Sequence, residues 1–437
     1  MRRNPSSHRR NYPPKTMENH ILISNARVID LGGPFNGKRV SIRIEDGVIT
    51  EIGKDLKVKK AEVWSEENLC VSPGWMDGQA HFRDPGEELK EGLIRGLHAA
   101  ASGGFTDVGV LPSTNPVIDT KASVAYLIAR SKDSAAPCNA LPIGAISENL
   151  EGKQLAEILD MGEAGAIAFS DDGPIERAGL LQKALEYTKP SGDVLISQPI
   201  EKDINPGSKM HEGPTSTALG LQGSPSEAET MRLKRDIDIL AYTGGRLHIP
   251  VISSAESVKL IKSAKKKGLA ITASTTPHHL TFIDEDLSGF NGTLKVVPPL
   301  RGKSDRKALR EAVADGTIDS VVSDHRPENI ETHDVEFTLS PNGIAGISSV
   351  FAAMNTACEK SDITRKIDCI SNATRRIYNI PEIHLQEGAA AKITLFNPKA
   401  EYIHNGVSAG VNDPWITETA LQGVVYGVIN GVEIFKN

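Results

Sequence analysis

The stretch that decides the fold runs Pro73-Gly74-Trp75-Met76-Asp77-Gly78-Gln79-Ala80-His81-Phe82-Arg83-Asp84-Pro85-Gly86. It is typical of a strand that ends in a polar tip and a turn. Strand side chains alternate between two faces, so we expect residues 79 and 81 to point at the same spot. A His-x-His pair at such a tip binds a metal ion. Here the first position is Gln79 and only His81 remains, which indicates a metal site that has lost part of its ligands.

Short apolar segments alternate with stretches that can form helices through the middle of the chain. The eight predicted strands are 74–81, 105–111, 139–145, 165–170, 193–198, 246–252, 270–276 and 317–324, and the clearest helices lie at 259–267 and 306–315. Eight βα units predict an α/β fold of the (β/α)8 TIM-barrel type, whose chemistry lies at the C-terminal ends of the strands. The candidate site positions at those ends are Gln79, His81, Ser113, Asp171, Asp172, Gln198, Val251, His278, His279 and Asp324.

Both ends of the chain have short alternating strands. Hairpin turns are expected at Asp46-Gly47 and Asn430-Gly431, and a strand is expected at 392–396. We therefore predict one small β-sandwich-like domain from residues 17–72 plus 385–437, and a barrel from 73–384. Residues 1–16 are basic and polar and lack the apolar core of a secretory signal, so they are interpreted as a disordered tail or an extension. Residues 205–224, rich in Gly, Pro and Ser, predict a long loop over the barrel mouth.

The composition excludes several classes of protein. The chain has 437 residues with 39% hydrophobic and 24% charged residues, which is ordinary for a globular protein. A net charge of -7 gives no reason to expect nucleic acid or an anionic membrane as a partner. No apolar run approaches the roughly 18–20 residues that span a bilayer. The four cysteines (Cys70, Cys138, Cys358 and Cys369) lack a C-x-x-C spacing and predict reduced core residues of a cytoplasmic protein.

Three polar groups at strand ends could either bind a metal ion or make hydrogen bonds that stabilise the fold. His81 and the pair Asp324-His325 fit a metal site by position, and equally fit side chains satisfied by hydrogen bonds. The pair Asp171-Asp172, before Gly173, could supply a bridging carboxylate or form an ordinary Asp-Gly turn. These alternatives stay open at this point.

Two further positions depend on how strand side chains alternate. Arg83 follows His81 by two residues, so it could share its face and bind a substrate carboxylate, or form a salt bridge at the barrel rim. His278 and His279 look like a ligand pair, but adjacent strand residues point to opposite faces. A helix-capping or outer supporting role is therefore expected for at least one of them.

Several stretches in order resemble class I dihydroorotases of the cyclic amidohydrolase superfamily, from about residue 21 to the C-terminus. They are PGWMDGQAHFRDPGEELKEG, GGFTDVGVLPSTNP, FSDDG, MHEGPTSTALGLQGSPSEAE, HIPVISSAESVKLIKSAK, TPHHLTF, VPPLR, SDHRPE and EGAAAKITLFNP. The resemblance implies a barrel of the amidohydrolase type, a zinc site, and hydrolysis of a cyclic amide in pyrimidine (UMP) biosynthesis.

The departures from the family pattern fall in the site. The replaced ligand positions are Gln79, Gln198 and Val251, each of which the resemblance expects to be histidine, although His248 stands at the other position of the H-x-x-H motif. His81, Asp172 and Asp324 persist as vestigial metal ligands, with Asp324 as the would-be proton shuttle. The family's substrate contacts also change, and the residues at these positions are Ser113, Val297 and Glu328. Glu328 is the last residue of the motif that reads D-H-A-P-H in the family. Arg83 remains as the substrate-binding residue.

Three hypotheses follow from this pattern. The first is a non-catalytic pseudo-dihydroorotase, homo-oligomeric, with zinc absent or weakly bound, that acts as a structural partner of aspartate transcarbamoylase. The alternative is an active zinc-dependent cyclic amidohydrolase with a degenerate one-metal site at His81, Asp172 and Asp324. A third is a sensor that binds a pyrimidine-like ligand through Arg83 without turnover.

Overall fold

The barrel is present and its strands follow the chain in order. The computed structural model describes residues 20–58 and 60–437, so the tail expected at 1–16 lies outside the described residues. The eight barrel strands are β6 (Trp75–Ala80), β7 (Phe105–Val110), β8 (Asn139–Gly144), β9 (Ala168–Ser170), β10 (Val194–Ile196), β13 (Arg246–Ile249), β14 (Ile271–Thr275) and β15 (Ser320–Val321). A parallel bridge between Ala80 and His325 closes the barrel. The eight predicted strands and the TIM barrel are confirmed.

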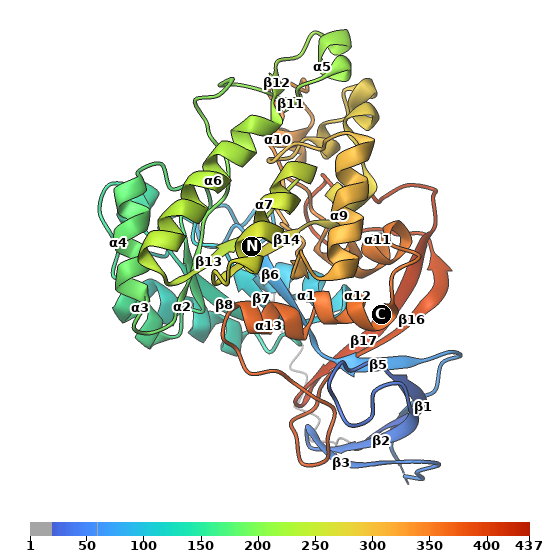
Figure 1. Cartoon of the computed structure of the whole chain (residues 1–437). Helices are drawn as coiled ribbons and strands as arrows, with labels where there is room; N and C mark the ends of the chain where they lie inside the picture. Colours follow the sequence, from blue (N-terminus) through green and yellow to red (C-terminus); the bar gives the residue numbers. More distant parts are fainter. Residues whose placement is uncertain (1–19, 59) are drawn as a thin grey trace, which may run out of the picture.

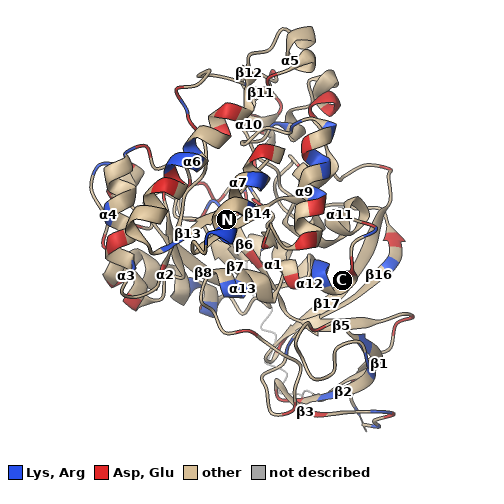
Figure 2. Cartoon of the chain, in the orientation of Figure 1, with Lys and Arg blue, Asp and Glu red and all other residues tan. Residues whose placement is uncertain are grey.

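Helices surround this barrel (Figure 1). They are α1 (Leu93–Ser102), α2 (Lys121–Asp133), α3 (Ile158–Ala164), α4 (Ala178–Thr188), α6 (Ser226–Thr243), α7 (Ala255–Lys266), α8 (Pro277–Thr281), α9 (Lys303–Asp315), α10 (Ile330–His333), α11 (Val350–Ala357), α12 (Ile363–Cys369) and α13 (Asn372–Ile377). Helix α7 shows why the sequence folds this way: the Ser254 hydroxyl caps its N-terminus, and Ile261 and Ala264 are buried. Basic and acidic residues are interspersed along α6 and α9 (Figure 2).

The predicted loop at 205–224 is only partly a loop. It contains the short strands β11 (Met210–His211) and β12 (Gly223–Ser224), with the helix α5 (Pro214–Leu219) between them. Pro214 occupies the first turn of α5, and Gly220 ends it in the left-handed conformation, with φ of 67°. The Gly and Pro residues that suggested a loop therefore start and stop a helix, and this segment projects at the top of Figure 1.

Both ends of the chain join one sheet at the opposite end of the molecule (Figure 1). Its strands are β1 (His20–Val28), β2 (Arg39–Glu45), β3 (Val48–Gly53), β4 (Glu62–Trp64), β5 (Cys70–Pro73), β16 (Lys392–Tyr402), β17 (Leu421–Asn430) and β18 (Glu433–Lys436). The order is β18-β17-β16-β5-β1-β2-β3, with β4 paired to β1, so β5 and β16 bring the two ends together. The expected β-rich domain from both termini is confirmed.

A buried ion triad connects this sheet to the barrel. Asp107 in β7 accepts hydrogen bonds from Arg375 in α13 at 2.6 Å and from Lys392 in β16 at 2.7 Å. Asn139 donates a further bond at 3.0 Å. Burial alone would raise the pKa of Asp107, but Lys392 and Arg375 lower it to about 2.

The four cysteines are buried and unpaired, as predicted. Within residues 20–58 and 60–437, no helix combines the length and apolar character needed to cross a membrane.

Candidate functional site

An arginine lies between two carboxylates at the barrel mouth. Asp172 follows β9 and Asp324 follows β15, and both have the left-handed backbone, with φ of 50° and 44°. Arg326 donates to both oxygens of Asp172, from Nη1 at 3.0 Å and from Nη2 at 2.5 Å. Its Nε donates to Oδ1 of Asp324 at 3.1 Å. The guanidinium thus bridges the two carboxylates that the sequence predicts as metal ligands.

The charges of this cluster depend on one another. Burial alone would raise the pKa of Asp172, but the Arg326 guanidinium lowers it below its usual value. The pKa of Asp324 is raised by burial and by the Asp172 carboxylate, which Arg326 offsets only in part. Burial would lower the pKa of Arg326, but Asp172 and Asp324 raise it above its usual value. Arg326 is therefore a permanent cation at this position.

Gln79 and His81 both reach this region, where hydrogen bonds engage the amide nitrogen of Gln79 and both ring nitrogens of His81. Gln79 donates from Nε2 to Oδ1 of Asp324 at 2.9 Å. His81 donates from Nε2 to the Ser113 carbonyl at 2.8 Å, and its Nδ1 accepts from the Arg83 backbone at 3.1 Å. Burial, assisted by the charge of Arg83, lowers the pKa of His81 to about 4, so the ring is neutral with both nitrogens engaged.

Arg83 is paired with the chain's own carboxylates. Strand β6 ends at Ala80 and Arg83 has φ of 59°, so the strand alternation that predicted a face shared with His81 does not apply. Its Nη2 donates to Glu328 at 2.6 Å and its Nε donates to the Pro327 carbonyl at 3.2 Å. Lys90 binds the other oxygen of Glu328 at 2.9 Å. Glu328 therefore pairs with the guanidinium that the sequence analysis expects to bind a substrate carboxylate.

The other replaced positions make local contacts. Gln198 donates to the Val297 carbonyl at 3.2 Å, and Val251 is a buried apolar side chain. His248 is hydrogen-bonded to Thr272 at 2.9 Å and to Ser274 at 3.2 Å. Asp171 accepts bonds from the backbone of Ile146 and Ser147 and from the Ser147 hydroxyl, which is a structural role.

The strand argument for His278 and His279 is wrong, because both lie in helix α8. Thr276 caps this helix by accepting from the His279 backbone at 3.3 Å. The ring of His279 also contacts the Thr276 hydroxyl at 2.7 Å and donates to the Pro298 carbonyl at 2.9 Å. Burial lowers the pKa values of both rings. The strand predicted at 270–276 ends before both histidines, so the alternation of strand side chains does not apply to them.

These residues do not fit the zinc that the family resemblance implies. Asp172 and Asp324 are engaged by a guanidinium, and both nitrogens of His81 are engaged by backbone groups. In the part of the chain that the structure describes, no three His, Cys, Asp or Glu side chains are grouped to hold a metal ion. Sequence analysis missed Arg326. Its signal was a cation two residues after Asp324, where the family motif D-H-A-P-H has alanine.

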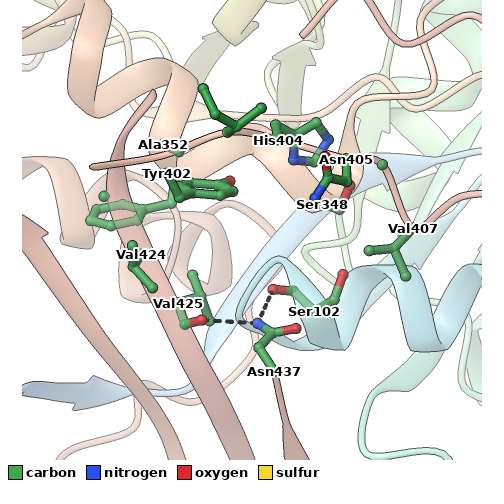
Figure 3. Close-up of a pocket in the computed structure, with 14 residues that line it drawn as sticks. Ser102, Ser348, Ala352, Tyr402, His404, Asn405, Val407, Val424, Val425 and Asn437 are labelled. Carbon is green, nitrogen blue, oxygen red and sulfur yellow. Dashed lines mark hydrogen bonds between the residues drawn. The ribbon is translucent and has the colours of Figure 1, made fainter. Parts of the chain in front are cut away.

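A cavity of about 250 Å³ lies elsewhere, beside β17 and α11 (Figure 3). Tyr402, His404 and Val424 are among its lining residues. Asn437 closes one side and donates to the Ser102 and Val425 carbonyls, each at 2.9 Å. No predicted site residue lines this cavity, so it is separate from the barrel mouth.

Known proteins resemble this chain over most of its length. Residues 69–257 match the Dihydro-orotase-like family. A protein of Pelotomaculum thermopropionicum named dihydroorotase is 40% identical over 86% of this chain and 89% of its own, and one of Syntrophus aciditrophicus is 37% identical over 95% and 99%. Among solved structures, the L-hydantoinase of Arthrobacter aurescens has a TM-score of 0.82 at 19% identity, covering 96% of both chains. The dihydropyrimidinase of Brevibacillus agri has a TM-score of 0.80 at 20% identity, covering 95% of this chain and 94% of its own. These solved structures establish the shared fold.

Proposed function

This chain belongs to the dihydroorotase family, and we propose that it is a non-catalytic member. On this proposal it serves pyrimidine biosynthesis in the cytoplasm as a structural partner of aspartate transcarbamoylase. The barrel is then retained for its surface and not for hydrolysis. Fold alone does not carry activity, so the proposal is argued from the site.

The observation that carries the proposal is the bidentate bond from Arg326 to Asp172, together with the bond from its Nε to Asp324. A metal hydrolase needs these carboxylates free to bind an ion that activates water. A cation that is part of the chain supplies charge but has no exchangeable water molecule. Arg83, the residue expected to bind a substrate carboxylate, is likewise paired with Glu328.

The catalytic half of the proposal is tested by dihydroorotate hydrolysis. The purified full chain, with added zinc, is compared with the 40% identical Pelotomaculum thermopropionicum protein as the positive control. We expect no turnover above buffer and zinc bound well below one ion per chain. Clear turnover would contradict the proposal and favour the alternative of a one-metal amidohydrolase at His81, Asp172 and Asp324.

A reconstruction sharpens this test. One variant restores histidines as Gln79→His, Gln198→His and Val251→His, and a second adds Arg326→Ala. If the guanidinium blocks the site, only the second variant should bind zinc. Equal zinc binding by both variants would show that the missing imidazoles, and not Arg326, limit the site.

The partner half has its own test. The full chain is mixed with the aspartate transcarbamoylase of the same organism and examined by size-exclusion chromatography with light scattering. We expect a complex larger than either component, and a homo-oligomer of this chain alone. Separate elution at micromolar concentrations would contradict the partnership without bearing on catalysis.

A further inference from the structure

The altered positions of the site bond to the two carboxylates that remain, Asp172 and Asp324. Gln79 and Ser113 stand where the family resemblance expects histidine and asparagine, and Arg326 stands where it expects alanine. Gln79 donates to Asp324, and the Ser113 hydroxyl donates to Oδ2 of Asp172. Arg326 donates to both carboxylates. Three substitutions scattered along the chain thus form one hydrogen-bonded cluster.

The two carboxylates come from strands that are not neighbours. Strand β9 and strand β15 are separated in the barrel by β10, β13 and β14, so a link between Asp172 and Asp324 crosses the mouth. The side chains of Asp172 and Asp324 are only 9% and 6% exposed. Buried carboxylates on opposite sides of a barrel repel each other and need a cation between them.

Arginine suits this position. Its planar guanidinium donates two parallel bonds to one carboxylate and still has Nε for a second. That is the arrangement at Asp172 and Asp324, and the Arg326 side chain is itself 19% exposed. A divalent ion would join the same two groups by coordination.

We propose that the Arg326 guanidinium is a built-in cation that holds Asp172 and Asp324 together in place of a divalent metal, so that the barrel mouth is ordered without one. Gln79 and Ser113 complete its bonding by donating to the same carboxylates. The inference goes beyond loss of catalysis, because it assigns a positive structural role to the residues that replaced the ligands.

The first test uses the unaltered chain. Its thermal unfolding midpoint is measured in buffer, after EDTA treatment, and with zinc chloride. We expect the same midpoint in all three, because the cation is covalently part of the chain. A midpoint that falls with EDTA or rises with zinc would overturn the proposal.

The second test separates charge from packing. Arg326→Met should lower the midpoint by several degrees, whereas Arg43→Met, which removes a surface pair with Glu45, should leave it nearly unchanged. Adding Asp172→Asn and Asp324→Asn to Arg326→Met should restore part of the loss, because no uncompensated carboxylate remains. Absence of that recovery would overturn the proposal, since lost packing would then explain the whole effect.

If Arg326→Met fails to fold, Arg326→Lys carries the same test. Lysine keeps the positive charge but cannot donate two parallel bonds to Asp172, so the unfolding midpoint of this variant should lie below that of the wild type. A midpoint at the wild-type value would contradict the need for the guanidinium. The two proposals can fail separately. If the chain hydrolyses dihydroorotate but its unfolding midpoint does not change with EDTA, the proposed function is contradicted and the role of Arg326 is not.

Discussion

The strongest prediction concerns Asp107, which joins barrel and sheet. Its carboxylate accepts from Arg375 and Lys392, and the side chains of Asp107 and Arg375 are each 2% exposed. Replacing Asp107 with Asn keeps the shape and removes the charge. Arg375 then faces a neutral amide in a buried position, and Lys392, whose side chain is 23% exposed, loses its carboxylate partner.

The magnitude follows from the pKa. Lowering the pKa of Asp107 from 3.8 to about 2 corresponds to roughly 2 kcal/mol in favour of the folded state, at about 1.4 kcal/mol per unit. Asp107→Asn loses this and also leaves the cations uncompensated, so we expect about 3–5 kcal/mol of destabilisation at pH 7. Because the folded pKa is the lower one, the stabilisation is complete above about pH 4 and is lost as the pH falls towards 2.

The assay is urea unfolding at pH 7, pH 5 and pH 3, followed by tryptophan fluorescence. The difference between wild type and Asp107→Asn should be the same at pH 7 and pH 5 and smaller at pH 3. The exposed Asp133→Asn serves as control and should change the free energy of unfolding by under about 0.5 kcal/mol. A difference below about 1 kcal/mol at pH 7 would refute the reasoning.

A double-mutant cycle checks the partner. Arg375→Met alone and together with Asp107→Asn should reveal a coupling energy of about 0.5–3 kcal/mol. Additive effects would mean that Asp107 and Arg375 stabilise the protein independently.

Two other predictions concern the barrel. Glu328→Gln removes the charge that binds Arg83 and Lys90, so the free energy of unfolding measured in urea should fall by about 1–3 kcal/mol. The matched control is Glu87→Gln, at a half-exposed side chain, which should change the free energy of unfolding far less. Equal effects of the two variants would contradict this account. Burial lowers the pKa of His248 to about 3, so NMR at pH 5 should show a neutral ring. The free energy of unfolding should fall as the pH drops below about 6.5, because the unfolded chain binds a proton that the folded ring does not. A ring that titrates near 6.5 would contradict its burial.

Most of the fold could be predicted because its signals are local. Eight apolar segments alternating with helical ones identify the barrel strands, and the Asp46-Gly47 turn identifies the first hairpin. The error at 205–224 has a physical cause: Gly and Pro mark breaks in structure but also cap helices, so Pro214 and Gly220 were open to both interpretations.

The site was harder to predict, because its bonds join distant residues. Positions 79, 81, 172 and 324 could be placed at the mouth from strand order alone. The bond from Arg326 to Asp172 spans 154 residues, and no local pattern indicates which carboxylate an arginine will bind. The same holds for Arg83, for which the sequence left open a substrate carboxylate or a salt bridge at the barrel rim, and its bond to Glu328 depends on the turn after β6.

The sheet built from both ends of the chain also constrains when the protein can fold. Trp75 bonds to Thr394, 319 residues further along the chain, and β5 pairs with β16. At about 5–20 residues per second, a ribosome needs roughly tens of seconds to deliver β16 after β5. In the folded protein β5 lies between β16 and β1. Until β16 is synthesised, the edge of β5 that will bind it is unpaired and can pair with other chains. Synthesis is therefore a period in which this protein exposes an unpaired strand edge.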